Sequence, residues 1–420
     1  MDISNNSQSE QSTRSPKPLK PVSVGAKVFC CIVLLICATV FTVLPHYIGT
    51  EGINPSLPFA ILLATLALSL AFILTLCKGK LFLSCALVGG IAVALLLGPW
   101  LTGLYAALLC ASIAAAALTA DGKTLSYLPA LIAALVGFGV SFALTRNPLL
   151  AACVLLPVTV GFVLSNSHQK GRSVIVSVGL SAGMLIGECL VLLLGSALLS
   201  GMQPTVEGLT EYVKAFHATV SGTLAETMQL MAETPEFAEW FALMLEQELT
   251  PELIAEFADI TASTVIGILP GACIMVAWIF GFIAHRGFTA LLVHSADKAD
   301  YPAHLTAYEP SVPTALFMIL CYATLLISSL FVQGEVVSLV ALNLVLALMP
   351  LMLVCGILSI VSNLKQARVK WPLLLTYALS AVFLGIAVVP MIAFFGAFDV
   401  IMKAIARTLE QKFNDFKGEQ

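Results

Sequence analysis

Long apolar segments, separated by short polar loops, follow one another through most of the chain. A membrane-spanning helix needs about 20 mainly apolar residues. The candidate segments are 27–48, 57–77, 81–98, 101–119, 127–145, 148–166, 172–200, 262–285, 313–332, 336–362 and 372–396. The pattern therefore predicts an all-α fold, a polytopic transmembrane helix bundle of about 10 to 12 spans.

One pair of these segments, 81–98 and 101–119, is separated only by Pro99 and Trp100. Proline removes a backbone hydrogen-bond donor and bends or breaks a helix. The pair is therefore either two tightly turned helices or one broken helix, and the number of spans depends on which of these holds.

Composition agrees with a membrane protein and argues against several other classes. Of the 420 residues, 59% are hydrophobic and 10% are charged, which is too apolar for a soluble protein of this size. The net charge of −4 is small and the basic residues are scattered, so we expect no nucleic acid partner. The sequence has no HExxH metal motif and no Walker lysine loop, and its one GxSxG string, at 179–183, lies inside a predicted spanning helix and not at a strand-to-helix turn. We therefore expect no metal, no cofactor and no enzymatic activity.

Changes in polarity divide the chain into five parts. Residues 1–24 are polar and rich in Ser and Pro, which predicts a disordered N-terminal tail. The other parts are N-terminal transmembrane helices (25–201), an acidic amphipathic helical insertion (202–261), C-terminal transmembrane helices (262–398) and an amphipathic C-terminal tail (399–420).

The insertion carries eleven acidic residues and a single lysine, Lys214. Two Thr-Pro-Glu triplets, at 234–236 and 250–252, combine a capping threonine, a first-turn proline and an acidic residue, which favours helix starts. A first amphipathic helix is predicted from Val206, Leu209, Val213, Phe216 and Val220, and a second from Phe237, Trp240, Phe241 and Met244. The insertion is either a cap on the outer mouth of the bundle or a solvated connector.

Basic residues predict the orientation, because cytoplasmic loops are enriched in Lys and Arg. With eleven spans, the N-terminal tail and the loops after the even-numbered spans share one side. The basic residues on that side are Lys17, Lys20, Lys27, Lys78, Lys80, Lys123, Lys170, Arg172, Arg286, Lys365, Arg368 and Lys370. We therefore expect a cytoplasmic N-terminus and an insertion on the outer side. The basic tail with Lys403 and Arg407 conflicts with this, because eleven spans place it outside.

The second half of the chain resembles a known family. The runs LPGACIMVAWIFGFIAHRGF, VQGEVVSLVALNLVLALMPLMLVCGILSIVSNLKQARV and VVPMIAFFGAFDVIMKAIAR occur in this order, after an upstream run LLPVTVGFVLSNSHQKGRSVIVSVGLSAGMLIGE. This order resembles the YybS-like family of predicted bacterial membrane proteins over roughly residues 80–410. The resemblance rests on three residues: Asn343 in the penultimate span, and Gly396 with Asp399 near the end. The family usually places an arginine soon after that aspartate, and here the nearest is Arg407.

The resemblance implies a bacterial inner-membrane location. The family has no established activity, and its members are distantly similar to the substrate-binding membrane subunits of energy-coupling-factor transporters. That similarity concerns the fold. It implies a small-molecule substrate and separate energising subunits, beside the lipid bilayer itself.

A glutamate stands inside the seventh predicted span, where residues 177–195 read SVGLSAGMLIGECLVLLLG. A charged side chain at the centre of a span costs about 2.5 to 3.5 kcal/mol on insertion scales. The cost is avoided if Glu188 is protonated or faces an internal cavity. Because Ser177 and Ser181 share its helix face, we interpret the three residues as a polar cavity wall. The alternatives are a structural hydrogen-bond anchor and a position near water in the outer leaflet.

A second feature of this span is a glycine at every fourth position: Gly179, Gly183 and Gly187. A stripe of small residues allows another helix to approach closely. We therefore predict that these three glycines form a helix-packing surface.

Together these features predict a small-molecule transporter or the substrate-binding membrane subunit of one. Its ligand-binding residues would be Glu188, Asn343, Ser181 and Ser177, in a site between the seventh and tenth spans. The amide of Asn343 is equally compatible with a bridge between helices. The alternative function is a non-transporting membrane scaffold or assembly factor whose acidic outer helices contact a partner.

Overall fold

The computed structural model describes most of the chain as helices and short connections. The described residues are 23–48, 56–77, 80–120, 127–234, 239, 250–292, 308, 310–331, 335–366, 375 and 388–418. They fall into two compact units, Met1–Cys189 with Ala277–Glu309, and Leu190–Val276 with Pro310–Gln420. All regular secondary structure in these residues is helical, which confirms the predicted all-α fold.

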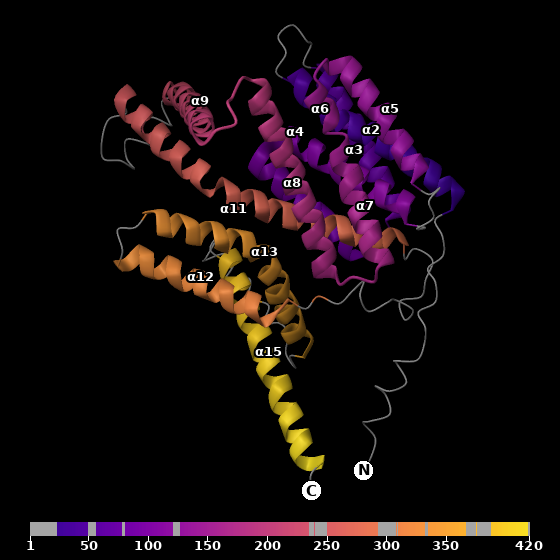
Figure 1. Ribbon diagram of the computed structural model, residues 1–420, viewed down its shortest axis with the longest axis vertical. Helices are drawn as coiled ribbons and strands as arrows, with labels where there is room; N and C mark the ends of the chain where they lie inside the picture. Colours follow the sequence, from indigo (N-terminus) through magenta and orange to yellow (C-terminus); the bar gives the residue numbers. More distant parts are fainter. Residues whose placement is uncertain are drawn as a thin grey trace. The chain divides into compact units, whose positions relative to one another are not determined.

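The first unit is built around two helices, α2 and α4 (Figure 1). Its elements are α2 (Val24–Ile48), α3 (Ser56–Leu76), α4 (Lys80–Thr119), α5 (Leu128–Thr145), α6 (Pro148–Ala152), α7 (Leu155–Gln169), most of α8 (Val174–Leu199) and the end of α11 (Pro251–Leu292). Helix α2 packs on α3, α4 and α5, and α4 packs on α3 and α7.

Small side chains allow α4 and α7 to approach closely. Residues 114–117 of α4 are four consecutive alanines with no exposed surface. A Cβ added at Gly161 of α7 would lie 2.5 Å from the Cβ of Ala115 and 2.7 Å from the backbone nitrogen of Ala116. This backbone-to-backbone packing is typical of helices inside a membrane.

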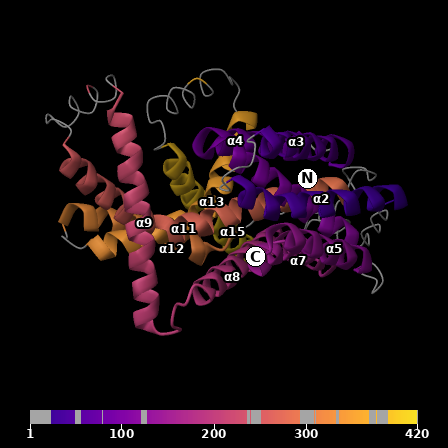
Figure 2. The same ribbon diagram turned by 90° about the horizontal axis from the view of Figure 1, so that it is seen from above.

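The second unit contains a group of three mutually packed helices, α12 (Val312–Phe331), α13 (Glu335–Gln366) and α15 (Val388–Gly418), which Figure 1 shows side by side. Its core is formed by methionines and alanines: Met318, Met349, Met352, Ala315, Ala393 and Ala397. Helix α9 (Val206–Ala232) belongs to the same unit and crosses the first part of α11 (Figure 2). Thr205 caps α9 by accepting a hydrogen bond from Gly208 N.

In the part of the chain that the structure describes, nine helices are long and apolar enough to cross a membrane, and α12 contains a shorter apolar stretch, Val312–Ser328. The chain is therefore a multi-pass integral membrane protein, as predicted. Many leucines, valines and phenylalanines on these helices are exposed, as expected for side chains that contact lipid.

Three boundaries differ from the expectations. Segments 81–98 and 101–119 form one continuous helix, α4, of 40 residues. Helix α11 runs for 42 residues from Pro251 through the expected limit at 261, because nothing interrupts its hydrogen-bond ladder there. Helix α15 likewise continues past residue 398 to Gly418.

The helix start at Thr250 is confirmed, since its hydroxyl accepts a hydrogen bond from Leu253 N at the beginning of α11. The second amphipathic helix, with Phe237 and Trp240, lies outside the described residues, as does most of the expected tail 1–24. Residues 372–387 of the last predicted span, apart from residue 375, are also outside them.

Candidate functional site

Two of the predicted site residues, Ser177 and Ser181, lie on the buried face of α8. Each is 1% exposed. The hydroxyl of Ser181 donates to the carbonyl oxygen of Ser177, 2.9 Å away, and the hydroxyl of Ser177 lies 3.2 Å from Nδ1 of His285 on α11. His285 is itself 3% exposed. The structure therefore adds a buried histidine to the predicted serine face.

Sequence reasoning missed His285, because it stands near the end of an apolar run beside Arg286 and resembles a residue at the membrane boundary. The only available signal was its place on α11 four residues after Gly281, a spacing that puts both on one face. A Cβ added at Gly281 would lie 3.1 Å from the carbonyl oxygen of Val178. The glycine thus brings α11 close enough for His285 to reach the serine face.

The glycine stripe of α8 makes a close approach at one of its three positions. A Cβ added at Gly179 would lie 2.9 Å from the ring of Trp278 on α11. At Gly183 and Gly187, a Cβ would have no atom of the described residues within 4 Å. The predicted packing role is therefore not supported at these two positions. Helices that cross at an angle separate within a turn or two of their closest point, so a regular stripe need not be covered along its whole length.

Glu188 lies three turns beyond Ser177 on nearly the same face of α8, about 20° away around the axis and roughly 16 Å along it. The residue is half-buried, but its Oε2 atom is buried and has no hydrogen-bond partner among the described residues. Thr159 on α7 is a hydrogen-bonding neighbour of this carboxyl group, and its hydroxyl also donates to the carbonyl oxygens of Leu155 and Leu156, at 3.1 and 3.0 Å. A buried carboxylate oxygen without a donor is therefore the most unusual polar group on this face.

The fourth predicted residue, Asn343 on α13, makes three hydrogen bonds. Its Oδ1 accepts from the N–H of Gly271 at 2.6 Å. Its Nδ2 donates to the carbonyl oxygens of Gly267 and Leu339, at 2.8 and 2.9 Å. In a regular helix the N–H of Gly271 would donate to the carbonyl oxygen of Gly267, four residues earlier. Pro270 of α11 lies between these two residues. The amide of Asn343 thus binds the backbone of α11 at its proline.

Both amide hydrogens of Asn343 are used in these bonds, which favours the bridging role over a ligand-binding one. Glu188 belongs to the first unit and Asn343 to the second, and each is described within its own unit. A single site that contains both residues remains a prediction.

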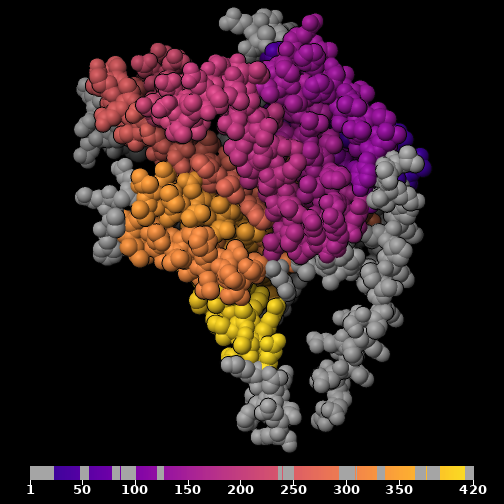
Figure 3. Space-filling view, in the orientation of Figure 1, coloured from indigo at the N-terminus to yellow at the C-terminus, as the bar shows by residue number. Residues whose placement is uncertain are grey.

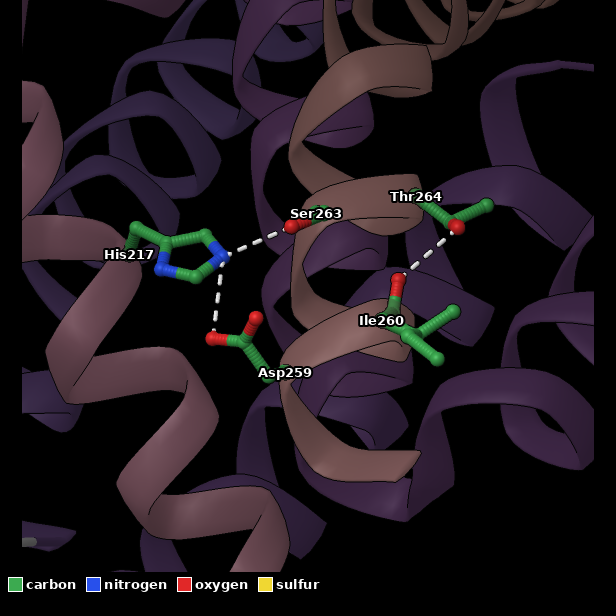
Figure 4. Close-up of polar contacts among 5 residues, drawn as sticks. All are labelled: His217, Asp259, Ile260, Ser263 and Thr264. Atoms are coloured by element: carbon green, nitrogen blue, oxygen red, sulfur yellow. Dashed lines mark hydrogen bonds and ion pairs between the residues drawn. The ribbon is translucent and has the colours of Figure 1, made fainter. Parts of the chain in front are cut away.

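A polar contact between α9 and α11 was not predicted (Figure 4). Nε2 of His217 lies 2.9 Å from the hydroxyl of Ser263 and 3.8 Å from a carboxylate oxygen of Asp259. Both partners meet the same ring nitrogen, whereas a catalytic Ser–His–Asp arrangement uses both nitrogens. The side chains of His217 and Asp259 are 28% and 63% exposed. The arrangement is that of an exposed contact that holds two helices together.

Two other features give little support for a functional site. Asp399 pairs with Lys403 one turn later on α15, at 2.6 Å. Within the described residues, no three His, Cys, Asp or Glu side chains are grouped so that they could hold a metal ion.

Comparison of the chain with protein-family models, curated proteins and solved structures gives no match. The class of protein, a multi-pass helical membrane protein, thus follows from its helices alone.

Proposed function

We propose that the protein is a small-molecule transporter or the substrate-binding membrane subunit of one. The observation that carries this proposal is the buried Oε2 of Glu188, which has no hydrogen-bond partner among the described residues. A structural anchor is expected to have its lone pairs satisfied, because an unsatisfied buried polar group destabilises the folded state. An ionisable group inside a membrane bundle that is not satisfied by the protein is instead typical of substrate and ion pathways.

The buried face of α8 supports the same proposal. Ser177, Ser181 and His285 line its first half, and Glu188 lies about 16 Å further along the helix. The serine–histidine group and Glu188 thus provide hydrogen-bonding positions for a ligand or a proton at two levels along α8. The family resemblance to substrate-binding subunits remains an expectation in the same direction.

Glu188→Gln tests the proposal, because it preserves size and hydrogen-bonding capacity but removes the ionisable group. We expect growth complementation or uptake to fall at least about tenfold, while the purified protein keeps or slightly raises its melting temperature. The stability is maintained because removal of a half-buried, unpaired charge does not cost folding energy. The matched control is Glu252→Gln at the exposed start of α11, which should leave activity unchanged. Full activity of the Glu188→Gln protein would refute the proposed role.

A scaffold or assembly factor remains the second candidate, and a feature of α9 favours it. No residue of α9 is buried, and Leu209, Val213 and Phe216 are each more than 40% exposed. Figure 3 shows α9 at the surface. Next to these residues, the corner between α8 and α9 forms an open groove of about 550 Å³ whose lining includes Glu207, Glu211 and Tyr212. Loss of a co-purifying protein on Phe216→Ser, with transport intact, would favour the scaffold.

The orientation is also a proposal. Helix α4 is about 60 Å long, twice the hydrocarbon thickness of a bilayer. If it crosses once, the N-terminus and the Lys123 loop lie on opposite sides, and the basic loops no longer all share the side of the N-terminus. The α9 segment lies opposite the Lys170 loop in either case, because only α8 separates them.

We therefore expect α9 outside the cytoplasm and the loop at Lys170 inside. In a cysteine-free background, a cysteine at Thr210 should react with a membrane-impermeant maleimide in intact cells, and one at Lys170 only after lysis. Labels at Lys78 and Lys123 on the same side would support a cytoplasmic N-terminus, and labels on opposite sides would place the N-terminus outside. Protection of Thr210 in intact cells would overturn the orientation.

A further inference from the structure

We propose that Glu188 binds a monovalent cation, carried by an ammonium group or an alkali-metal ion, in exchange for a proton. The inference rests on the proposed transport function and names the chemistry of its ligand. Its starting point is the geometry around one atom, Oε2 of Glu188, which is buried on α8 beside Thr159 of α7.

The described part of the chain places no positively charged partner on this carboxylate. Among the described residues, no lysine, arginine or histidine forms an ion pair with Glu188. Cys189 follows Glu188 directly on α8, and the thiol of Cys189 lies near that of Cys153 at the end of α6. A thiol carries no positive charge in either protonation state, so these two groups cannot balance the charge of the carboxylate.

A carboxylate in a membrane bundle is strongly disfavoured when, as here among the described residues, one of its oxygens is unpaired and no positively charged partner is present. Two states remove that cost, a protonated carboxyl group and a carboxylate bound to a cation. The exchange is balanced in atoms and charge, because the entering cation replaces the proton, which leaves to water. An anionic ligand would instead be repelled by the ionised carboxylate and could not balance its charge.

Thr159 completes the oxygen set. Its one hydroxyl hydrogen is shared among the carbonyl oxygens of Leu155 and Leu156 and the carboxyl group of Glu188, and its oxygen lone pairs are available to a ligand. A carboxylate oxygen and a hydroxyl oxygen from neighbouring helices suit a small cation or an N–H donor, both of which need acceptors.

Dicyclohexylcarbodiimide tests the exchange directly, because it modifies protonated carboxyl groups in apolar surroundings. The full-length protein in detergent is treated at mildly acidic pH, and modification of Glu188 is quantified by peptide mass spectrometry. Sodium, potassium and methylammonium chlorides are compared with tetramethylammonium chloride, which has the same charge but is bulky and has no N–H donor. We expect Glu188 to be modified, and at least one small cation to reduce the modification by about tenfold.

Comparison of the salts shows whether an alkali-metal ion or an ammonium group binds at Glu188. Protection by sodium or potassium alone indicates an alkali-metal ion, and protection by methylammonium alone indicates an amine. Thr159→Ala should weaken the protection while Thr159→Ser retains it, and both variants should still be modified at Glu188. Absence of modification at Glu188, or modification that none of the small cations changes, would overturn the proposal.

The outcome is separable from that of the transport assay. Protection at Glu188 together with normal activity of Glu188→Gln would mean that a cation binds but the proposed transport role is wrong. Lost activity of Glu188→Gln without any protection would keep the transport role and reject the cation.

Discussion

Replacing Gly396 by valine is expected to destabilise the protein by about 2 to 4 kcal/mol, because the side chain would overlap the backbone of a neighbouring helix. A Cβ at Gly396 on α15 would overlap the carbonyl oxygen of Met352 and lie 2.6 Å from the nitrogen of Gly356, both on α13. Gly356 is in the reciprocal position, since a Cβ there would overlap the carbonyl oxygen of Ile392 on α15. Neither backbone can move away without separating the two helices.

The effect is measured by heating the purified protein with a thiol-reactive fluorescent dye. Cys355 on α13 is 6% exposed beside this contact, so it should react at a lower temperature in Gly396→Val. The control is Gly139→Val on α5, where a Cβ would have no atom of the described residues within 4 Å. Equal melting temperatures for the two variants would show that the α13–α15 contact is looser than its geometry indicates.

Asn343→Leu is the second change with a large expected effect. It removes the two hydrogen bonds from α13 to the backbone of α11, at Gly267 and Gly271, and the bond to Leu339 within α13. Interhelical hydrogen bonds inside a membrane contribute about 0.6 to 2 kcal/mol each. The proline at 270 makes full recovery of a regular helix turn unfavourable, because its ring clashes with the carbonyl oxygen one turn earlier. We therefore expect a loss of about 1 to 4 kcal/mol in stability.

Amide hydrogen exchange of α11 around Gly271, compared with thermal unfolding, measures this effect. Asn343→Asp should be nearly as damaging, because it keeps the acceptor for Gly271 but loses both donated bonds. Val340→Leu, at an exposed position one turn earlier on α13, is the matched control and should change little. If Asn343→Leu is as stable as the parent but loses transport, Asn343 is a ligand-binding residue, as the sequence alone also allowed.

Helix locations were predictable because they depend on local sequence. An apolar stretch of about 20 residues must satisfy its own backbone hydrogen bonds inside a bilayer, whatever it packs against. The start of α11 at Thr250 and Pro251 was likewise visible, because a capping threonine and a first-turn proline act within four residues. Helix continuity was harder to judge: Pro99 indicated an interruption, yet α4 runs through it from Lys80 to Thr119.

The partners of polar residues were not predictable in the same way. Ser177 and Ser181 were expected to share a face with Glu188, which follows from helical periodicity. That Ser177 meets His285, 108 residues later, depends on how α11 crosses α8 at Gly281. The same holds for Asn343, whose three hydrogen bonds were compatible with either of the two predicted roles until the position of Pro270 was known.

The sequence by itself determined that the chain is a multi-pass helical membrane protein, and which faces of its helices are polar. Those properties follow from hydrophobicity and the helical period, which act over one or two turns. Only the tertiary structure decided which glycines are close contacts, that a buried histidine joins the serine face, and that Oε2 of Glu188 has no hydrogen-bond partner among the described residues. These depend on contacts between helices far apart in the chain, and identical local patterns, as at Gly179 and Gly183, can be covered or left open by the crossing of a partner helix.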